Sequence, residues 1–364
     1  MPPVPPRPIA ALRRATSPGA ARAGRAALPG VALVAACAIL LVGAPDARGL
    51  VFASPESEPA SERPPDFPYW DHVIQRRYEG PTVIYLGAGA FLTASHVGWG
   101  EVMMGDTILP PDFGWRHTLM NADGSGADAI VFRAPPDAAL PSLPLLPLAK
   151  ESPRPGDEVF LIGFGRERAK VIEWSDAERV DFGFEWSAKG RKRWGTNRVS
   201  EVDRQVAQAR RLTDIFSVVF DAPRSRDETR YEAQAAHGDS GGAVFVRRDG
   251  EWLLAGMMIS VSSERAHPSN ASFYGDSTFI LDIASYRDEI LRWARPACAN
   301  GADDDGDEKI DFPADPGCAS QTDLDEREPV APPTKSALAV VLILAGLVVL
   351  VGSWTHAYRR GDLR

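Results

Sequence analysis

The chain is poor in cysteine and histidine, and it contains no long basic segment. Only three cysteines and six histidines occur among its 364 residues. No His-Glu-x-x-His pattern or other zinc-ligand spacing is present, which disfavours a zinc metalloprotease. The formal net charge of −9 is spread without basic blocks, and this argues against a nucleic acid as the partner. One short basic cluster, Lys189–Trp194, is predicted to be a solvated hairpin loop.

Long apolar runs are confined to the two ends. Near the N-terminus, a basic segment precedes an apolar run over residues 31–43 and then small residues, the pattern of a secretory signal. We predict a signal peptide over residues 1–49, with cleavage after Gly49 or Ala53. A lipoprotein signal ending at Cys37 is the alternative, although the apolar run continues past that cysteine.

At the C-terminal end, residues 336–354 form an almost unbroken apolar stretch followed by arginines. A helix needs about 20 residues to span a bilayer, so this stretch is a predicted transmembrane helix. Residues 355–364 are then a basic cytoplasmic tail, and 321–335 a proline-containing stalk. The predicted protein is exported and has a single membrane anchor, with its ectodomain outside the cytoplasm in the cell envelope or at the surface. Such a tail also resembles bacterial envelope-sorting signals, so its retention or removal stays open.

An acidic segment lies between the two remaining cysteines. In an exported protein the even pair Cys298 and Cys318 is predicted to form a disulfide. The enclosed loop alternates carboxylates around a glycine, and a hard cation prefers such oxygen ligands. The run resembles the aspartate-rich calcium-binding repeats of extracellular proteins, so residues 297–320 are predicted to bind calcium. An acidic, disordered stalk is the alternative. The candidate ligands are Asp303, Asp305, Asp307 and Asp311.

The run 238–242, Gly-Asp-Ser-Gly-Gly, places a serine between glycines. A serine hydroxyl becomes a nucleophile only when a base takes its proton and backbone amides receive the oxyanion. The glycines allow a sharp bend that turns the N–H groups of Gly238 and Ser240 to one point. Two candidate partners lie upstream. They are His96, in a Thr-Ala-Ser-His-Val run, and Asp128, which directly precedes an apolar strand.

The same five residues also satisfy the Gly-x-Ser-x-Gly motif of α/β-hydrolases. In that fold the serine comes first along the chain, the acid second and the histidine last, and a helix follows the serine. Here a strand, an Asp-Gly turn and another strand are predicted after Ser240. The order His96, Asp128, Ser240 contradicts the hydrolase.

Taken together, the three motifs resemble the trypsin-like (chymotrypsin-fold) serine proteases, in particular secreted bacterial members, here with a C-terminal membrane or sorting tail. The resemblance covers residues 70–296. It implies an all-β fold of two Greek-key β-barrels with a C-terminal helix, to which the chain adds its transmembrane helix. It also implies that His96 is the general base, that Asp128 orients it, and that Ser240 attacks the scissile carbonyl of a protein or peptide substrate without a cofactor. The predicted function is a serine endopeptidase of the cell envelope that forms an acyl-enzyme on Ser240.

Short segments between glycines and prolines agree with an all-β domain. The predicted strands are 82–86, 129–132, 158–163, 215–220, 243–246 and 252–257, with Pro141–Pro147 bridging the barrels and a helix at 282–294. Residues 50–69 contain a Ser-, Pro- and Glu-rich run and are predicted to be a linker or propeptide.

The primary specificity pocket is predicted from the resemblance. The family residue six before the nucleophile lies at the pocket base, and here it is the neutral Gln234. A neutral amide cannot compensate a buried cation, so small or neutral substrate side chains are expected. His237, Ser260 and Val261 complete the predicted pocket. The chain lacks the Ile-Val-Gly-Gly-type N-terminus that many members pair with the residue matching Asp239, so the partner of Asp239 stays open.

Two other classes of function remain as alternatives. One is a catalytically idle protease fold that serves as a binding module, and the other is an envelope adhesin whose function lies in the acidic segment. A covalent serine-hydrolase probe distinguishes them from an enzyme, because only an activated serine reacts with it.

Overall fold

The computed structural model describes residues 49–59, 62–77, 80–176, 179–188, 190–262, 266–320, 323 and 326–327. The predicted signal peptide apart from Gly49, the transmembrane helix 336–354 and the basic tail lie outside these residues. Among the described residues, no helix has both the length and the apolar character needed to cross a membrane.

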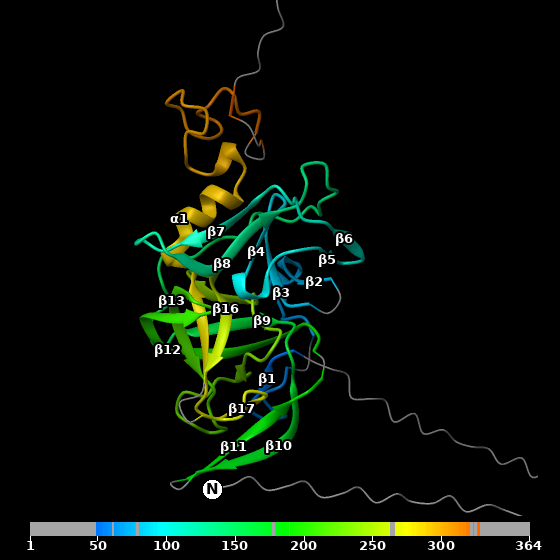
Figure 1. Cartoon of the computed structure of the whole chain (residues 1–364), viewed down its shortest axis with the longest axis vertical. Helices are drawn as coiled ribbons and strands as arrows, with labels where there is room; N and C mark the ends of the chain where they lie inside the picture. Colours follow the sequence, from blue (N-terminus) through cyan, green and yellow to red (C-terminus); the bar gives the residue numbers. More distant parts are fainter. Residues whose placement is uncertain are drawn as a thin grey trace, which may run out of the picture. The chain divides into compact units, whose positions relative to one another are not determined.

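The C-terminal part of the predicted protease domain forms a closed barrel of six antiparallel strands (Figure 1). Their β-branched and aromatic residues alternate between two buried sides, which suits strands that close on themselves. Around the barrel the strands are β12 (Arg193–Gln208), β13 (Arg211–Val219), β18 (Ser277–Asp282), β16 (Glu251–Ser262), β15 (Ala243–Arg248) and β9 (Glu158–Gly163). The strands predicted at 158–163, 243–246 and 252–257 are confirmed.

The N-terminal part is a seven-stranded antiparallel sheet rather than the second closed barrel that was predicted. Its two outer strands, β6 and β7, do not pair with each other. Pro110 and Pro111 follow β6 directly, and proline has no N–H to donate to a closing ladder. The strand order is β6 (Thr107–Leu109), β5 (Val102–Met104), β2 (Val73–Arg76), β3 (Thr82–Gly87), β4 (Ala90–Thr93), β8 (Gly126–Arg133) and β7 (Arg116–Met120).

The predicted C-terminal helix is present as α1 (Ile283–Ala294) and links the two β units. The Asp282 side chain caps it by accepting the Ala284 N–H at 3.0 Å. Tyr286, buried on the inner face of α1, donates its hydroxyl to Asn121 of the sheet part at 2.6 Å. The same hydroxyl accepts the N–H of Asp214 in the barrel at 2.9 Å. The helix therefore fixes the units whose junction holds the candidate site.

The described part of residues 50–69 is packed against the domain and is not the loose linker that was one of the two predictions; the propeptide stays a prediction. Leu50, Val51 and Phe52 are buried, and β1 (Val51–Phe52) pairs with β14 (Ala233–Gln234). Phe67 lies in the core, 4.9 Å between ring centroids from Phe245. A few large apolar side chains outweigh the polar residues around them, because their burial contributes about 1.5–3 kcal/mol each.

The basic cluster is likewise not a solvated loop. Arg193 is 3 % exposed and contacts Glu58 at 2.6 Å, and Arg191 contacts Glu62 at 2.6 Å. The ammonium of Lys192 lies 4.1 Å from the centre of the Trp70 ring, and burial lowers the pKa of Lys192 to about 7. These cations hold the acidic N-terminal segment against the barrel.

A further three-stranded sheet consists of β10 (Arg168–Ser175), β11 (Val180–Trp186) and β17 (Ala271–Phe273). The β10–β11 hairpin extends from the end of the barrel (Figure 1). Three short 3₁₀ helices complete the described elements: η1 (Trp70–His72), η2 (Ser95–Val97) and η3 (Ala297–Ala299).

Candidate active site

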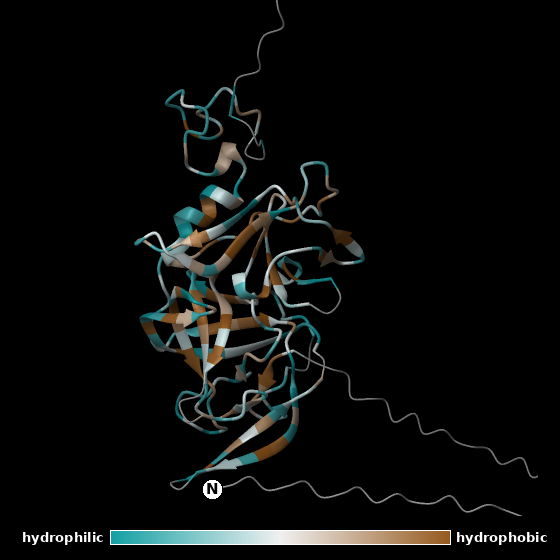
Figure 2. Ribbon diagram, in the orientation of Figure 1, coloured by the Kyte–Doolittle hydropathy of each residue, from teal (hydrophilic) through white to brown (hydrophobic). Residues whose placement is uncertain are grey.

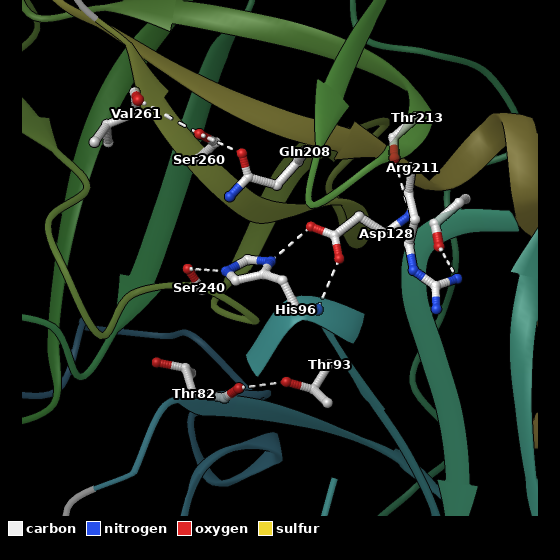
Figure 3. Close-up of polar contacts among 11 residues, drawn as sticks. Thr82, Thr93, His96, Asp128, Gln208, Arg211, Thr213, Ser240, Ser260 and Val261 are labelled. Carbon is white, nitrogen blue, oxygen red and sulfur yellow. Dashed lines mark hydrogen bonds and ion pairs between the residues drawn. The ribbon is translucent and has the colours of Figure 1, made fainter. Parts of the chain in front are cut away.

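The three predicted catalytic side chains meet at the junction of the two β units (Figure 3). His96 lies in η2, Asp128 in β8, and Ser240 in the loop between β14 and β15. His96 Nε2 is 3.1 Å from Ser240 Oγ, and His96 Nδ1 is 2.6 Å from Asp128 Oδ2. The other carboxylate oxygen accepts the backbone N–H of His96 at 2.8 Å. Both carboxylate oxygens of Asp128 therefore contact His96 and fix its position.

The surroundings of Asp128 fix the state of the imidazole. Asp128 is fully buried, and its backbone N–H donates to Thr213 Oγ1 at 2.9 Å. An ionised carboxylate only accepts hydrogen bonds, so the facing Nδ1 carries a proton. This leaves the Nε2 lone pair directed at the Ser240 hydroxyl. Thr213 was missed by sequence analysis, since a threonine in a strand carries no functional signal.

Asp123, which precedes Asp128 by five residues in the sequence, lies outside the site. It is exposed in a turn, where its carboxylate accepts the Ser125 N–H at 2.8 Å. The structure thus brings Asp128, but not Asp123, to His96.

The loop around Ser240 leaves two N–H groups without a partner. Asp239, Gly241 and Gly242 donate their N–H groups to carbonyls of the protein. Within the described part of the chain, no hydrogen bond uses the N–H of Gly238 or of Ser240. These are the two donors predicted for the oxyanion hole.

Thr82, which sequence analysis also missed, supports this loop from the N-terminal sheet. Its hydroxyl donates to the Gly238 carbonyl at 3.1 Å and accepts the Phe164 N–H at 3.1 Å. Gly241 packs against the same residue with a φ of +86°, and a Cβ there would lie 2.0 Å from the Thr82 carbonyl oxygen. Only glycine fits at this position.

Asp239 is satisfied by backbone groups. It is fully buried and accepts the N–H groups of Gly165 at 2.7 Å and Ala236 at 2.8 Å, and also that of Leu50. Burial raises the pKa of Asp239 to about 7. Since Leu50 follows the predicted cleavage point at Gly49, cleavage there would place an α-ammonium beside this carboxylate. Cleavage after Ala53 would instead remove β1.

We expect the pH dependence of stability to report on this contact. A pKa raised from 3.8 to about 7 means that the contribution of Asp239 to stability is present below pH 3.8 and is lost as the pH rises through about 7. In a chain that begins at Leu50, the α-ammonium group lowers the pKa of Asp239, and the loss of stability with rising pH is removed. Thermal unfolding midpoints should therefore fall between about pH 4 and pH 7 for the uncleaved chain only. Acetylating the new N-terminus should restore the fall, because it removes the charge. Identical pH profiles for all three chains would contradict this assignment.

A cleft of about 680 Å³ opens over Ser240 and includes three of the four predicted pocket residues: His237, Ser260 and Val261. Gln234 is the exception, because it is 1 % exposed and does not line the cleft. It lies in β14, whose pairing with β1 encloses it. Ala235 and Ala236 line the wall instead.

The acidic segment holds part of the predicted calcium site. Cys298 and Cys318 form the predicted disulfide. Asp303, Asp305 and Asp307 are exposed, and each places one carboxylate oxygen within 4.8 Å of the others. Asp311, the fourth predicted ligand, does not belong to this cluster. Its carboxylate accepts the backbone N–H groups of Asn300 and Gly301 at 3.0 and 2.9 Å. Calcium binding stays a prediction.

Comparisons with known proteins gave low similarity. No protein-family model and no curated protein matches the chain. Among solved structures, it is similar to the inactive form of the Rv3671c protease of M. tuberculosis, with 17 % identity and a TM-score of 0.37 over 62 % of this chain and 90 % of that one. It is also similar to a mutant of human heparin binding protein (15 %, TM-score 0.41, 67 % and 94 %) and to neuropsin, a serine protease of mouse brain (18 %, TM-score 0.41, 64 % and 96 %).

Proposed function

We propose that this protein is a serine endopeptidase. The observation that carries the proposal is the continuous set of contacts from Ser240 Oγ through His96 to the buried Asp128, beside two unpaired N–H groups in a cleft. A nucleophile, a base, a group that orients the base and an oxyanion site are the parts that acyl transfer needs.

The reaction follows from these positions. Ser240 Oγ attacks the substrate carbonyl carbon while His96 Nε2 takes the hydroxyl proton, and the N–H groups of Gly238 and Ser240 bind the oxyanion. The imidazolium then gives its proton to the leaving amine, the C–N bond breaks, and an acyl ester on Ser240 remains. A water molecule, deprotonated by His96, attacks the ester, and Ser240 regains its proton as the acid product leaves.

The envelope location belongs to the same proposal and is supported by sequence alone, through the predicted signal peptide 1–49 and the apolar segment 336–354. Against the idle binding module and the adhesin, the 3.1 Å contact of Ser240 with His96 favours an enzyme. A fluorophosphonate probe should label the wild-type chain and leave the Ser240→Ala variant unlabelled. An unlabelled wild-type chain that binds peptides without cleaving them would support the binding module.

We expect small or neutral side chains before the scissile bond. No aspartate or glutamate occurs among the described residues that line the cleft, and Ala235 and Ala236 form its wall. Two acids lie close to the cleft in sequence, and both are fully buried. Glu232 is held by Thr229 and Asn197, and Asp239 by backbone N–H groups. A cationic substrate side chain would therefore enter without a counter-charge. A fluorogenic library that varies only this substrate position checks the expectation, and a dominant preference for Arg or Lys would contradict it.

A further inference from the structure

The β10–β11 hairpin has two unlike faces. On one face, Asp181 contacts His267 at 3.0 Å, and Gly183 packs closely on the Ser272 carbonyl and the Phe273 ring. On the other face, Val171 is 67 % exposed, Val180 51 % and Phe182 50 %. The register confirms that these three share a side. Val171 pairs with Phe184, and Val180 and Phe182 precede Phe184 at alternate positions of the same strand. Apolar residues along the hairpin are visible in Figure 2.

This exposed face borders a groove of about 510 Å³. The opposite wall is formed by residues 53–55 with Pro223 and Tyr274. The charged group in the groove is the guanidinium of Arg168, which lies 5.1 Å from the centre of the Phe184 ring and is stacked over it. A groove of this size with mainly apolar walls suits apolar side chains.

The groove and the substrate cleft are separate cavities that are lined by neighbouring residues of the hairpin. Trp186 lines the cleft, and its cross-strand neighbour Arg168 lines the groove. Phe182, Phe184 and Trp186 alternate along β11 and so point to the same side. From Trp186 to Phe182 the strand advances four residues, which is about 13 Å. A polypeptide leaving the cleft along β11 therefore reaches the groove about four residues beyond those bound in the cleft.

We propose that this groove is a second substrate-binding site, which takes an apolar, extended segment of the polypeptide being cleaved. The proposal rests on the proposed endopeptidase function, since it makes one chain occupy both the cleft and the groove. Its apolar lining selects Leu-, Val- or Phe-rich segments. Because the paired residues Trp186 and Arg168 line the cleft and the groove respectively, its position favours the substrate over a second copy of this chain or a lipid surface. The groove would add affinity for long substrates without contacting the reacting bond.

The test uses the full chain and peptides of one length with the same cleaved sequence. Two apolar peptides carry a Leu-Val-Leu cluster about four to eight residues from the scissile bond, one on each side of it, and each has a reference peptide with Ser-Asn-Ser at the same place. We expect kcat/KM to be about tenfold higher for one apolar version, through a lower KM, because one or two apolar side chains are buried. Phe182→Glu and Val171→Glu should each bring the ratio of kcat/KM for the apolar peptide to kcat/KM for its polar reference close to one. Phe113→Glu is the matched control, since Phe113 is 76 % exposed and lies outside both cleft and groove.

The failure of this proposal differs from the failure of the proposed function. Binding of the same peptides to the Ser240→Ala chain, measured by calorimetry, reports on the groove even if no bond is cleaved. Equal affinities for the apolar and polar peptides would overturn the groove. A preference that Phe182→Glu leaves intact, or a Phe182→Glu variant that changes only the oligomeric state in light scattering, would also overturn it.

Discussion

Replacing Ser240 with alanine is expected to lower kcat by about 10⁶-fold, because the members of a catalytic triad act as a unit. The variant loses the atom that forms the acyl ester, whereas the Gly238 and Ser240 N–H groups and the cleft remain. Initial rates on a fluorogenic peptide, with the fold checked by circular dichroism, measure the effect. A variant that keeps a tenth of the wild-type rate would show that the assignment of the nucleophile is wrong.

The matched control is His96→Ala, alone and combined with Ser240→Ala. Because His96 acts only through the hydroxyl 3.1 Å away, the double variant should be about as slow as either single variant. Additive losses would show that the two side chains act in separate steps.

Asp128→Asn is expected to lower kcat by about 10⁴-fold without unfolding the protein. The asparagine has nearly the same shape and keeps an oxygen that can accept the backbone N–H of His96. Its NH₂ group would face His96 Nδ1 and donate a hydrogen bond where the aspartate accepts one. The ring proton of His96 would then lie on Nε2, which could no longer take the proton of Ser240. The rate as a function of pH, compared with the wild type, measures the loss.

Asp123→Asn serves as the control, because Asp123 is an exposed turn residue that contacts Ser125 and not His96. Its rate should stay near that of the wild type. If Asp123→Asn were the slower of the two variants, the identification of Asp128 as the partner of His96 would be reversed.

Features that depend on residues close together in the chain were predictable from the sequence. The glycines around Ser240 signal a tight loop, and Gly241 indeed has the positive φ and the close backbone approach that exclude other residues. The apolar strand that follows Asp128 in the sequence predicts a buried acid, and the carboxylate of Asp128 is indeed fully buried in β8. Four of the six barrel strands, β9, β13, β15 and β16, and the apolar stripe on α1 were predicted for the same reason, since periodicity is a local property.

Contacts between distant segments were not predictable. Residues 50–69 look polar by composition, but Leu50 contacts Asp239 and Phe67 packs in the core. Both contacts depend on apolar surface that the folded barrel provides. The cations at 191–193 look like a surface loop until the N-terminal segment supplies Glu58 and Glu62. Gln234 has the position of a pocket residue in the sequence, yet the pairing of β14 with β1 encloses it.

By itself, the sequence determined the chemistry available to this protein: a serine in a glycine loop, an imidazole and a buried acid in the order His96, Asp128, Ser240. The tertiary structure alone decided that these groups meet, that Thr82 and Thr213 support them, and that a groove forms beside the β10–β11 hairpin. The physical reason is that residue type and spacing set local conformation, whereas a site assembled from η2, β8 and the loop before β15 depends on how two β units pack. That packing is the sum of many long-range burials, and no short stretch of the chain carries it.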